Sequence, residues 1–264
     1  MKSQIGRHRE GLLLTRSPAQ NRRLLDVLES HRATALPVLE RPLLDILAVT
    51  PESADKQRIQ RLDQYDHVIF ISQNAVIHGV SLLADYWPQW PSSLHWYGVG
   101  AVTGALLNSL GIVCTVPHNY SSEGLLELPE LRVVKAQKVL IVRGAGGGRE
   151  WLRDELMARG AQVDYLEVYQ RRWREYPEGL LTLEEAASIL IVLAYSSESL
   201  ERLAALLPGP LAANFLIVPS ERIQTLAKDM GFGKVSVVRP DDEAMAAEIL
   251  RIWDAPIAES LPRK

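Results

Sequence analysis

The chain has 264 residues, of which 47% are hydrophobic and 23% are charged, as is usual for globular proteins. Its net charge of −3 gives no basis for binding nucleic acid, and no apolar run approaches the roughly 18 residues of a membrane span. Residues 1–10 are polar, unlike a signal peptide, and the single cysteine, Cys114, excludes an internal disulfide, so we expect a cytoplasmic protein.

Short apolar runs alternate with segments of helical period along the chain, which is typical of parallel sheets covered by helices on both faces. The expected strands are 11–15, 33–39, 67–72, 94–99, 112–116, 138–142, 162–169, 188–195, 214–218 and 234–238. The expected helices include 21–30, 75–86, 101–110, 149–159, 199–206 and 221–230. Two sets of five strands predict an α/β protein with two doubly wound parallel sheets.

The order of elements repeats once. Segments 12–16 and 139–143 each open a strand–helix–strand unit, segments 68–72 and 191–196 each precede a helical pattern, and 96–111 matches 215–231. The offsets are about 127, 124 and 120 residues, too long for a solenoid repeat. The repeat therefore predicts two similar lobes, and the cleft between them is the candidate ligand site.

Two long extended runs, 36–47 and 163–174, resemble each other and have no clear turn between their ends. Both are candidates for strands that cross from one lobe to the other. The first lobe would then comprise 1–39 and 173–264, and the second would comprise 40–172. A simple division near residue 130 is the alternative that the periodicity leaves open.

Small, hydroxylic, amide and arginine residues follow the predicted strands, at the ends where open parallel sheets bind ligands. A serine or asparagine before a helix can simply be an N-cap, but its recurrence at strand after strand favours an anionic ligand. The candidate binding residues of this kind are Arg16, Ser72, Asn74, Gly100, Thr103, Ser121, Ser122, Arg143, Gly144, Ser196, Ser197 and Ser220.

A glycine-rich segment, 144–148, follows a predicted strand and leads to Arg149, another candidate for anion binding. It contains the first two glycines of a dinucleotide fingerprint but has arginine at the last position, so an anion-binding turn is favoured over a dinucleotide site. The six histidines are scattered, and no motif predicts a metal site or a nucleophile elbow. Cys114, in the apolar run 112–116, is expected to be a buried strand residue, and His118 a solvated loop residue.

Together, these segments resemble the uroporphyrinogen-III synthases over about residues 11 to 250. The landmarks that carry the resemblance are 14–16, 68–76, 97–100 with Thr103, Pro117 before 121–125, 139–144 with Arg149, 163–169 and 218–220. The chain departs from the family pattern at 194–195, before Ser196, and in the additional glycines at 146–148.

The resemblance implies two flavodoxin-like lobes joined by a two-stranded connection, acting as a monomer without cofactor or metal. The implied substrate is linear hydroxymethylbilane, which carries eight carboxylates, loses its hydroxyl as water and closes through a spiro intermediate with its terminal pyrrole inverted. Positioning is the main catalytic demand of such a reaction, and one proton donor to the leaving hydroxyl assists it. Tyr169 matches the family's tyrosine at the end of its strand and is the candidate donor; a structural tyrosine packed at the connection is the alternative.

Two other functions compete with this one. A two-lobed module could bind a small anionic ligand without chemistry, and a transferase could use the glycine-rich segment to bind a nucleotide. The absence of a Walker lysine counts against the second alternative.

Overall fold

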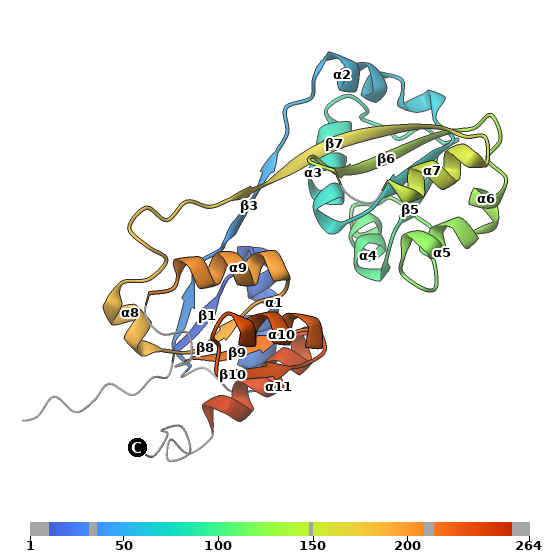
Figure 1. The fold of residues 1–264 in the computed structure, drawn as a ribbon. Coiled ribbons are helices and arrows are strands. Elements are labelled where there is room, and N and C mark those ends of the chain that lie inside the picture. Colours follow the sequence, from blue (N-terminus) through green and yellow to red (C-terminus); the bar gives the residue numbers. More distant parts are fainter. Residues whose placement is uncertain (1–10, 32–35, 148–149, 209–213, 255–264) are drawn as a thin grey trace, which may run out of the picture. The chain divides into compact units, whose positions relative to one another are not determined.

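The computed structural model describes residues 11–31, 36–147, 150–208 and 214–254. These residues form two compact units (Figure 1). The first unit contains the described residues up to Asp45 and from Trp173 onward, and the second is Ile46–Arg172. In the described ranges, no helix has both the length and the apolar character needed to span a membrane.

The first unit is built on a five-stranded sheet with the order β10-β9-β8-β1-β2, and all of its neighbouring strands are parallel. Its strands are β1 (Gly11–Leu14), β2 (Val38–Glu40), β8 (Ile189–Leu193), β9 (Phe215–Val218) and β10 (Lys234–Val237). Its helices are α1 (Pro18–Ser30), α8 (Leu183–Ser188), α9 (Ser197–Leu206), α10 (Glu221–Asp229) and α11 (Asp242–Trp253).

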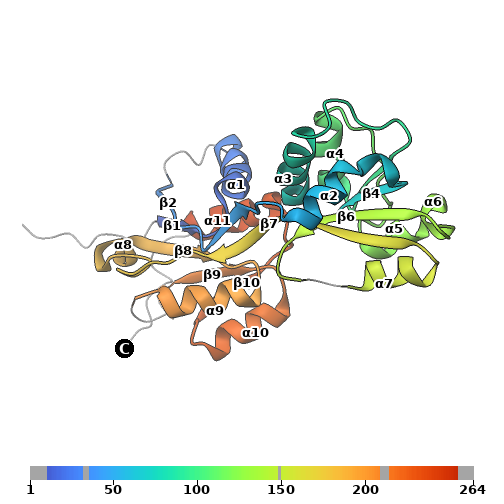
Figure 2. The same cartoon turned by 90° about the horizontal axis from the view of Figure 1, so that it is seen from above.

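Side chains that alternate along these strands pack against helices on opposite faces of the sheet. Leu12 and Leu14 of β1 join a cluster with α1 and α11, whereas Leu13 joins a cluster with α9 and α10. Figure 2 shows these two helix pairs on the two sides of the sheet. Near-continuous burial of a strand on both faces is typical of a parallel sheet, and it explains the apolar run of β1.

The second unit is built on a sheet with the order β3-β7-β6-β4-β5. Its strands are β3 (Leu44–Ala48), β4 (His67–Phe70), β5 (His95–Gly98), β6 (Lys138–Gly144) and β7 (Gln162–Trp173). Its helical segments are α2 (Ser53–Gln60), the 3-10 turn η1 (Leu62–Gln64), α3 (Gln73–Ala84), α4 (Ala101–Ser109), α5 (Ser122–Glu127), α6 (Pro129–Arg132) and α7 (Trp151–Ala158).

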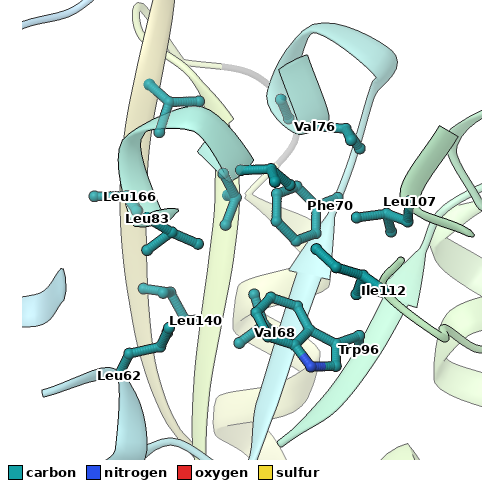
Figure 3. Close-up of a cluster of buried hydrophobic side chains, with 14 of the residues drawn as sticks. Leu62, Val68, Phe70, Val76, Leu83, Trp96, Leu107, Ile112, Leu140 and Leu166 are labelled. Atoms are coloured by element: carbon teal, nitrogen blue, oxygen red, sulfur yellow. The ribbon is translucent and has the colours of Figure 1, made fainter. Parts of the chain in front are cut away.

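The core of the second unit also lies on both faces of its sheet. One cluster packs Phe70 and Leu140 against α3 and α4, with Trp96 and Ile112 beside them (Figure 3). The opposite cluster packs Ile69 and Ile141 against α5, α6 and α7.

The strand orders explain the sequence repeat. In the first unit, β1 and β2 come from the first half of the chain, whereas β8, β9 and β10 come from the second. The second unit takes β6 and β7 from the second half and β4 and β5 from the first. The orders β2-β1-β8-β9 and β7-β6-β4-β5 are equivalent, so each unit combines the opening of one half with the remainder of the other. The predicted fold class is confirmed: two doubly wound, largely parallel sheets joined by a two-stranded connection.

Three local predictions were wrong. Residues 112–116 form no regular strand; they run beside β5 through a single bridge from Thr115 to Tyr97. This segment lies at the sheet edge, where Val113 is 87% exposed, and Cys114 is only half-buried. The expected strand at 33–39 begins only at Val38, and its residues 33–35 lie outside the described part of the chain.

The third correction concerns the connection. The run 36–47 is not one strand but contains all of β2 and most of β3, separated around Pro42, which cannot donate a backbone hydrogen bond to a ladder. In contrast, β7 continues over 12 residues and runs antiparallel to β3: Val49 N–H donates to Val168 O, and Arg174 N–H donates to Leu43 O. Residues 40–45, expected in the second lobe, belong to the first unit.

Candidate functional site

The carboxyl end of β4 brings a serine to a tyrosine of β7. Ser72 follows β4 and caps α3, because its Oγ accepts a hydrogen bond from Ala75 N–H at 3.0 Å. The same Oγ lies 3.2 Å from the hydroxyl oxygen of Tyr169, and either hydroxyl can be the donor. The ring of His78, on the next turn of α3, is tilted against the Tyr169 ring at 5.8 Å between centroids.

A β-bulge turns Tyr169 toward α3. The pairing of β6 with β7 shifts register between Arg143, opposite Glu167, and Gly144, opposite Tyr169. Strict alternation would place Val168 and Tyr169 on opposite faces, yet both pack in the core cluster beneath α3. The extra residue therefore redirects the Tyr169 side chain, as bulges do beside functional sites, and that side chain is only 3% exposed.

The absence of a side chain at Gly144 makes room for the phenol. A Cβ atom at this position would lie 2.7 Å from Cζ and 3.0 Å from the hydroxyl oxygen of Tyr169, closer than side-chain atoms approach. The backbones of the two segments are also in direct contact, since Ala145 N–H donates to Tyr169 O at 2.6 Å. Gly144 thus has a steric role that its place in a glycine-rich segment did not indicate.

The glycine-rich segment is described as far as Gly147, and the predicted binding residue Arg149 lies outside the described residues. Gly146 and Gly147 have φ angles of 90° and 91°, which side-chain-bearing residues rarely adopt. The following helix, α7, begins at Trp151 with Glu150 as its N-cap. The Glu150 side chain does not cap this helix; its carboxylate accepts hydrogen bonds from Arg143 and Tyr165 instead.

Arg143 lies 4% exposed on the face of the sheet that α7 covers. Its guanidinium is 3.0 Å from Glu150 and 3.6 Å from Glu167, and it stacks over the ring of Tyr165 at 4.2 Å. Hydrogen bonds from the Tyr165 hydroxyl and from Arg143 hold the pKa of Glu150 below its usual range, while burial and Glu150 raise the pKa of Tyr165 to about 12. Arg143 is therefore already paired with acids of its own unit.

The remaining candidates of the second unit lie at the starts of helices. Asn74 is in the first turn of α3, Gly100 precedes α4, and Thr103 is buried within α4. Ser121 caps α5 by accepting a hydrogen bond from Gly124 N–H at 3.1 Å, and Ser122 is the first residue of that helix.

The carboxyl ends of the first sheet carry a different arrangement. Arg16 follows β1, forms an ion pair with Asp242 at 2.8 Å and lies over the ring of Tyr195 at 4.0 Å. Burial raises the pKa of Tyr195 to about 12, and its hydroxyl is buried without a hydrogen-bond partner among the described residues. Arg16 and Arg143 occupy equivalent places in the repeat, and each lies over a tyrosine ring.

The serines of the first unit also begin helices. Ser196 caps α9 by accepting a hydrogen bond from Ser199 N–H at 3.1 Å, and the Ser199 hydroxyl completes the capping box. Ser197 is the first residue of α9, and Ser220 precedes α10 without a side-chain cap. Each sheet thus brings its own candidates to one edge, because parallel strands end on the same side.

Sequence reasoning missed the acids and aromatic rings that engage the two arginines, namely Glu150, Tyr165, Tyr195 and Asp242. The repeat itself was a usable signal, because residues equivalent to a stacked arginine should have similar neighbours. The pairing of Ser72 with Tyr169 had no such signal, since it depends on the bulge in β7.

Two features lie away from these residues. A polar cavity of about 310 Å³ beside β7 is lined by Asp55, Arg58, Arg153, Val163, Asp164, Tyr165 and Glu167, none of which is a predicted site residue. Within the described ranges, no three or more His, Cys, Asp or Glu side chains gather as a metal would require.

Comparison with known proteins identifies the family. Residues 25–247 match the model of the family described as uroporphyrinogen-III synthase HemD. The chain belongs to the uroporphyrinogen-III synthase family. It is 32% identical over 215 residues to the uroporphyrinogen-III synthase of Salmonella typhimurium, covering 77% of this chain and 86% of that relative. It is also 32% identical to the Escherichia coli uroporphyrinogen-III synthase over 204 residues, or 74% and 82% of the two chains.

Solved structures of uroporphyrinogen-III synthases share the fold. A mutant synthase from Thermus thermophilus matches with a TM-score of 0.55 and 16% identity, covering 92% of this chain and 98% of that one. The Helicobacter pylori protein also matches with a TM-score of 0.55, at 15% identity and with 92% and 99% coverage. The uroporphyrinogen-III synthase family cyclises hydroxymethylbilane in haem biosynthesis, so the predicted enzyme class is confirmed.

Proposed function

We propose that this chain converts linear hydroxymethylbilane to uroporphyrinogen III, with Tyr169 donating the proton that lets the hydroxyl leave as water. The observation that carries the proposal is the meeting of Tyr169, opposite the last residue of β6, with Ser72, which follows β4, in a chain of this family. The terminal pyrrole is inverted during closure, through a spiro intermediate.

The chemistry requires little from acidic or basic groups. An electron-rich pyrrole expels hydroxide readily, because its nitrogen stabilises the azafulvenium cation that remains. A positioned phenol assists this step by protonating the leaving oxygen, and a general acid contributes roughly 10²–10⁴-fold. The larger demand is to hold the substrate so that the substituted carbon of the last pyrrole attacks.

The substrate carboxylates suit the edges described above. At α3, α4, α9 and α10, helix N-termini direct backbone N–H groups and positive dipole ends past the strand ends. We propose that the edge of each sheet binds substrate carboxylates in this way. The candidates Asn74, Gly100, Thr103, Ser121, Ser122, Ser196, Ser197 and Ser220 contribute backbone or hydroxyl donors to these edges.

Arg16 and Arg143 enter the proposal with a narrower role. Both are paired with acids of their own unit, so binding a substrate carboxylate directly would require exchanging those partners. Until such an exchange, the acids neutralise each arginine and hold it over its tyrosine ring. The proposal further includes action as a monomer in the cytoplasm, without a cofactor or metal.

The isomer composition of the product tests this function. Purified protein is given freshly prepared hydroxymethylbilane, and the uroporphyrinogens are separated after oxidation. We expect the type III isomer above the type I product of spontaneous closure. Only type I product from protein with a cooperative unfolding transition would contradict the proposal, and calorimetric binding of the bilane without turnover would then support a binding module.

A further inference from the structure

The hydroxyl of Ser72 has two neighbours and a single proton to give. A serine hydroxyl offers one donor hydrogen and two acceptor lone pairs. Ala75 N–H already uses one lone pair, since the backbone amide can only donate. The Tyr169 oxygen, 3.2 Å away, is the other neighbour, and the structure offers Ser72 Oγ–H no other hydrogen-bond acceptor among the described residues.

We propose that Ser72 is a positioning residue, which donates its hydroxyl hydrogen to the Tyr169 oxygen and so leaves the phenol hydrogen directed at substrate. The sequence had assigned Ser72 to substrate binding. This inference rests on the proposed role of Tyr169 as proton donor. The opposite polarity, with Tyr169 donating to Ser72, would turn the phenol hydrogen inward and leave none for the leaving group.

The hydrogen bond from Ser72 also stabilises the Tyr169 oxygen after the phenol has given up its proton. When the phenol hydrogen passes to the leaving oxygen, the C–O bond breaks with its electron pair and water departs. The negative charge then remains on the Tyr169 oxygen, where a hydrogen bond from Ser72 is stronger than it is to the neutral phenol. After the spiro intermediate rearranges, the macrocycle closes at the free α-carbon of the last pyrrole, and the proton lost from that carbon restores the phenol.

Three further contacts fix the phenol in the same place. The bulge in β7 points Tyr169 toward α3, Gly144 leaves space for its ring, and the His78 ring packs against the Tyr169 ring. Ser72 is itself held, because its capping bond ties it to the first turn of α3. The donor and acceptor are thus both anchored by regular structure, as an accurately positioned site requires.

A double-mutant cycle tests the inference on the full chain. The proteins compared are the wild type, Ser72→Ala, Tyr169→Phe and the double variant, each assayed for kcat and KM in formation of the type III isomer. We expect Ser72→Ala to lower kcat by about 10-fold with little change in KM. In the Tyr169→Phe background, we expect the same change to alter kcat by less than about 2-fold, because the acceptor is gone.

Two controls separate this role from helix capping. Ser72→Thr keeps the hydroxyl and the cap on an extended backbone, so it should restore kcat to near the wild-type value. Thr182→Ala removes the equivalent cap of α8, where Thr182 accepts from Glu185 N–H, and should lower Tm while leaving kcat unchanged.

A spectroscopic arm is independent of turnover. Subtracting the Raman spectrum of each Tyr169→Phe protein from that of its parent isolates the tyrosine Fermi doublet, whose intensity ratio reports whether the phenol oxygen accepts a hydrogen bond. We expect Ser72→Ala to change this ratio and Ser72→Thr to restore it. An unchanged ratio, or kinetic effects of the two substitutions that multiply, would overturn the inference, whereas absence of type III product from wild type would contradict only the proposed function.

Discussion

The carboxyl edges of the two sheets share a topology but not their chemistry. In the second unit, β7 continues past the edge, and its bulge sets Tyr169 against the N-cap Ser72. In the first unit, the equivalent strand β2 ends at Glu40, and the hydroxyl of the equivalent N-cap Ser196 donates to the Ser199 hydroxyl on its own helix. The scaffold was therefore repeated, while the candidate proton donor arose on one sheet only.

The tyrosines at the two edges differ in the same way. The hydroxyl of Tyr169 has a serine partner, whereas Tyr195 presents its ring to Arg16 and its buried hydroxyl has no partner within the described part of the chain. Tyr169 thus makes its polar contact through the hydroxyl oxygen, whereas Tyr195 makes its contact through the aromatic face. We therefore expect loss of the Tyr169 hydroxyl to lower kcat, and loss of the Tyr195 hydroxyl to leave kcat unchanged.

The largest effect is expected from Tyr169→Phe. Losing the proton donor should lower kcat about 100-fold, within the range of general acid catalysis, with Tm nearly unchanged because the ring stays in the core. The matched change Tyr195→Phe should leave kcat unaltered and leave Tm equal or slightly higher, since it removes an unsatisfied buried hydroxyl. Steady-state assays and thermal melts of both proteins measure this contrast; full activity of Tyr169→Phe would refute the donor role.

The next largest effect is expected from Gly144→Ala. The added Cβ would meet the Tyr169 ring at 2.7 Å, so the ring or β6 must move, and overpacking of this kind costs about 1–3 kcal/mol. Urea unfolding should show that loss together with a fall in kcat. Gly144→Ala should cost less in the Tyr169→Leu background than in wild type, because the opposing side chain is then shorter. An equal loss in both backgrounds would show that the contact is not the cause.

Substitution of the two stacked arginines should lower the free energy of unfolding by different amounts. Arg143→Met removes the buried partner of Glu167 and leaves Glu150 with the Tyr165 hydroxyl and the more exposed Arg153 at 3.6 Å. We expect a loss of about 1–2 kcal/mol, reduced by the partial exposure of both acids. Arg16→Met should cost less than about 1 kcal/mol, because Asp242 keeps Arg23 at 3.9 Å. Parallel urea titrations compare the two variants, and equal losses would show that the clusters are not distinguished by their remaining partners.

The smallest effect is a pH dependence of the second unit. His67, 2% exposed at the start of β4, hydrogen-bonds Tyr97 and Gln137, and burial lowers its pKa below the ordinary 6.5. The hydrogen bond with Gln137 and the charges of Asp66 and Glu130 oppose this shift of the pKa, whereas nearby His95 adds to it. The unfolded chain therefore takes up the proton more readily, and stability is complete above about pH 6.5 and falls as the pH drops below it.

Hydrogen exchange at pH 5 and 7.5 locates this loss. The corresponding strand β8 begins with Ile189 and has no titratable counterpart, so protection should decrease in the second unit before the first. His67→Gln should reduce the difference between the two pH values. Equal loss of protection in both units would assign the acid sensitivity elsewhere.

Much of the fold followed from the sequence because its signals are local. Apolar runs such as 189–193 identified nearly every described strand, and the repeat indicated how the lobes are assembled. Helices α2, α5, α6, α8 and α11 were not among the expected helices. The segment 112–116 misled because its apolar residues suggested a buried strand, whereas it lies at an exposed sheet edge. Pro42 ended the first crossing strand earlier than its extended appearance suggested.

The site was less predictable because it depends on contacts between distant residues. Ser72 and Tyr169 were both candidates, but their contact required the one-residue register shift in β7, which no local pattern reveals. The ion pairs of Arg16 and Arg143 likewise join residues from separate elements. Both arginines were candidates for binding an anionic ligand, and both are paired with acids of the protein.

The most direct test of the central claim is the isomer ratio formed from hydroxymethylbilane by wild type, Tyr169→Phe and Tyr195→Phe under identical conditions. We expect mainly type III product from wild type and Tyr195→Phe, whereas Tyr169→Phe should give mainly type I product, as spontaneous closure does. Type I product alone from folded wild-type protein, or equal type III formation by all three proteins, would contradict that claim.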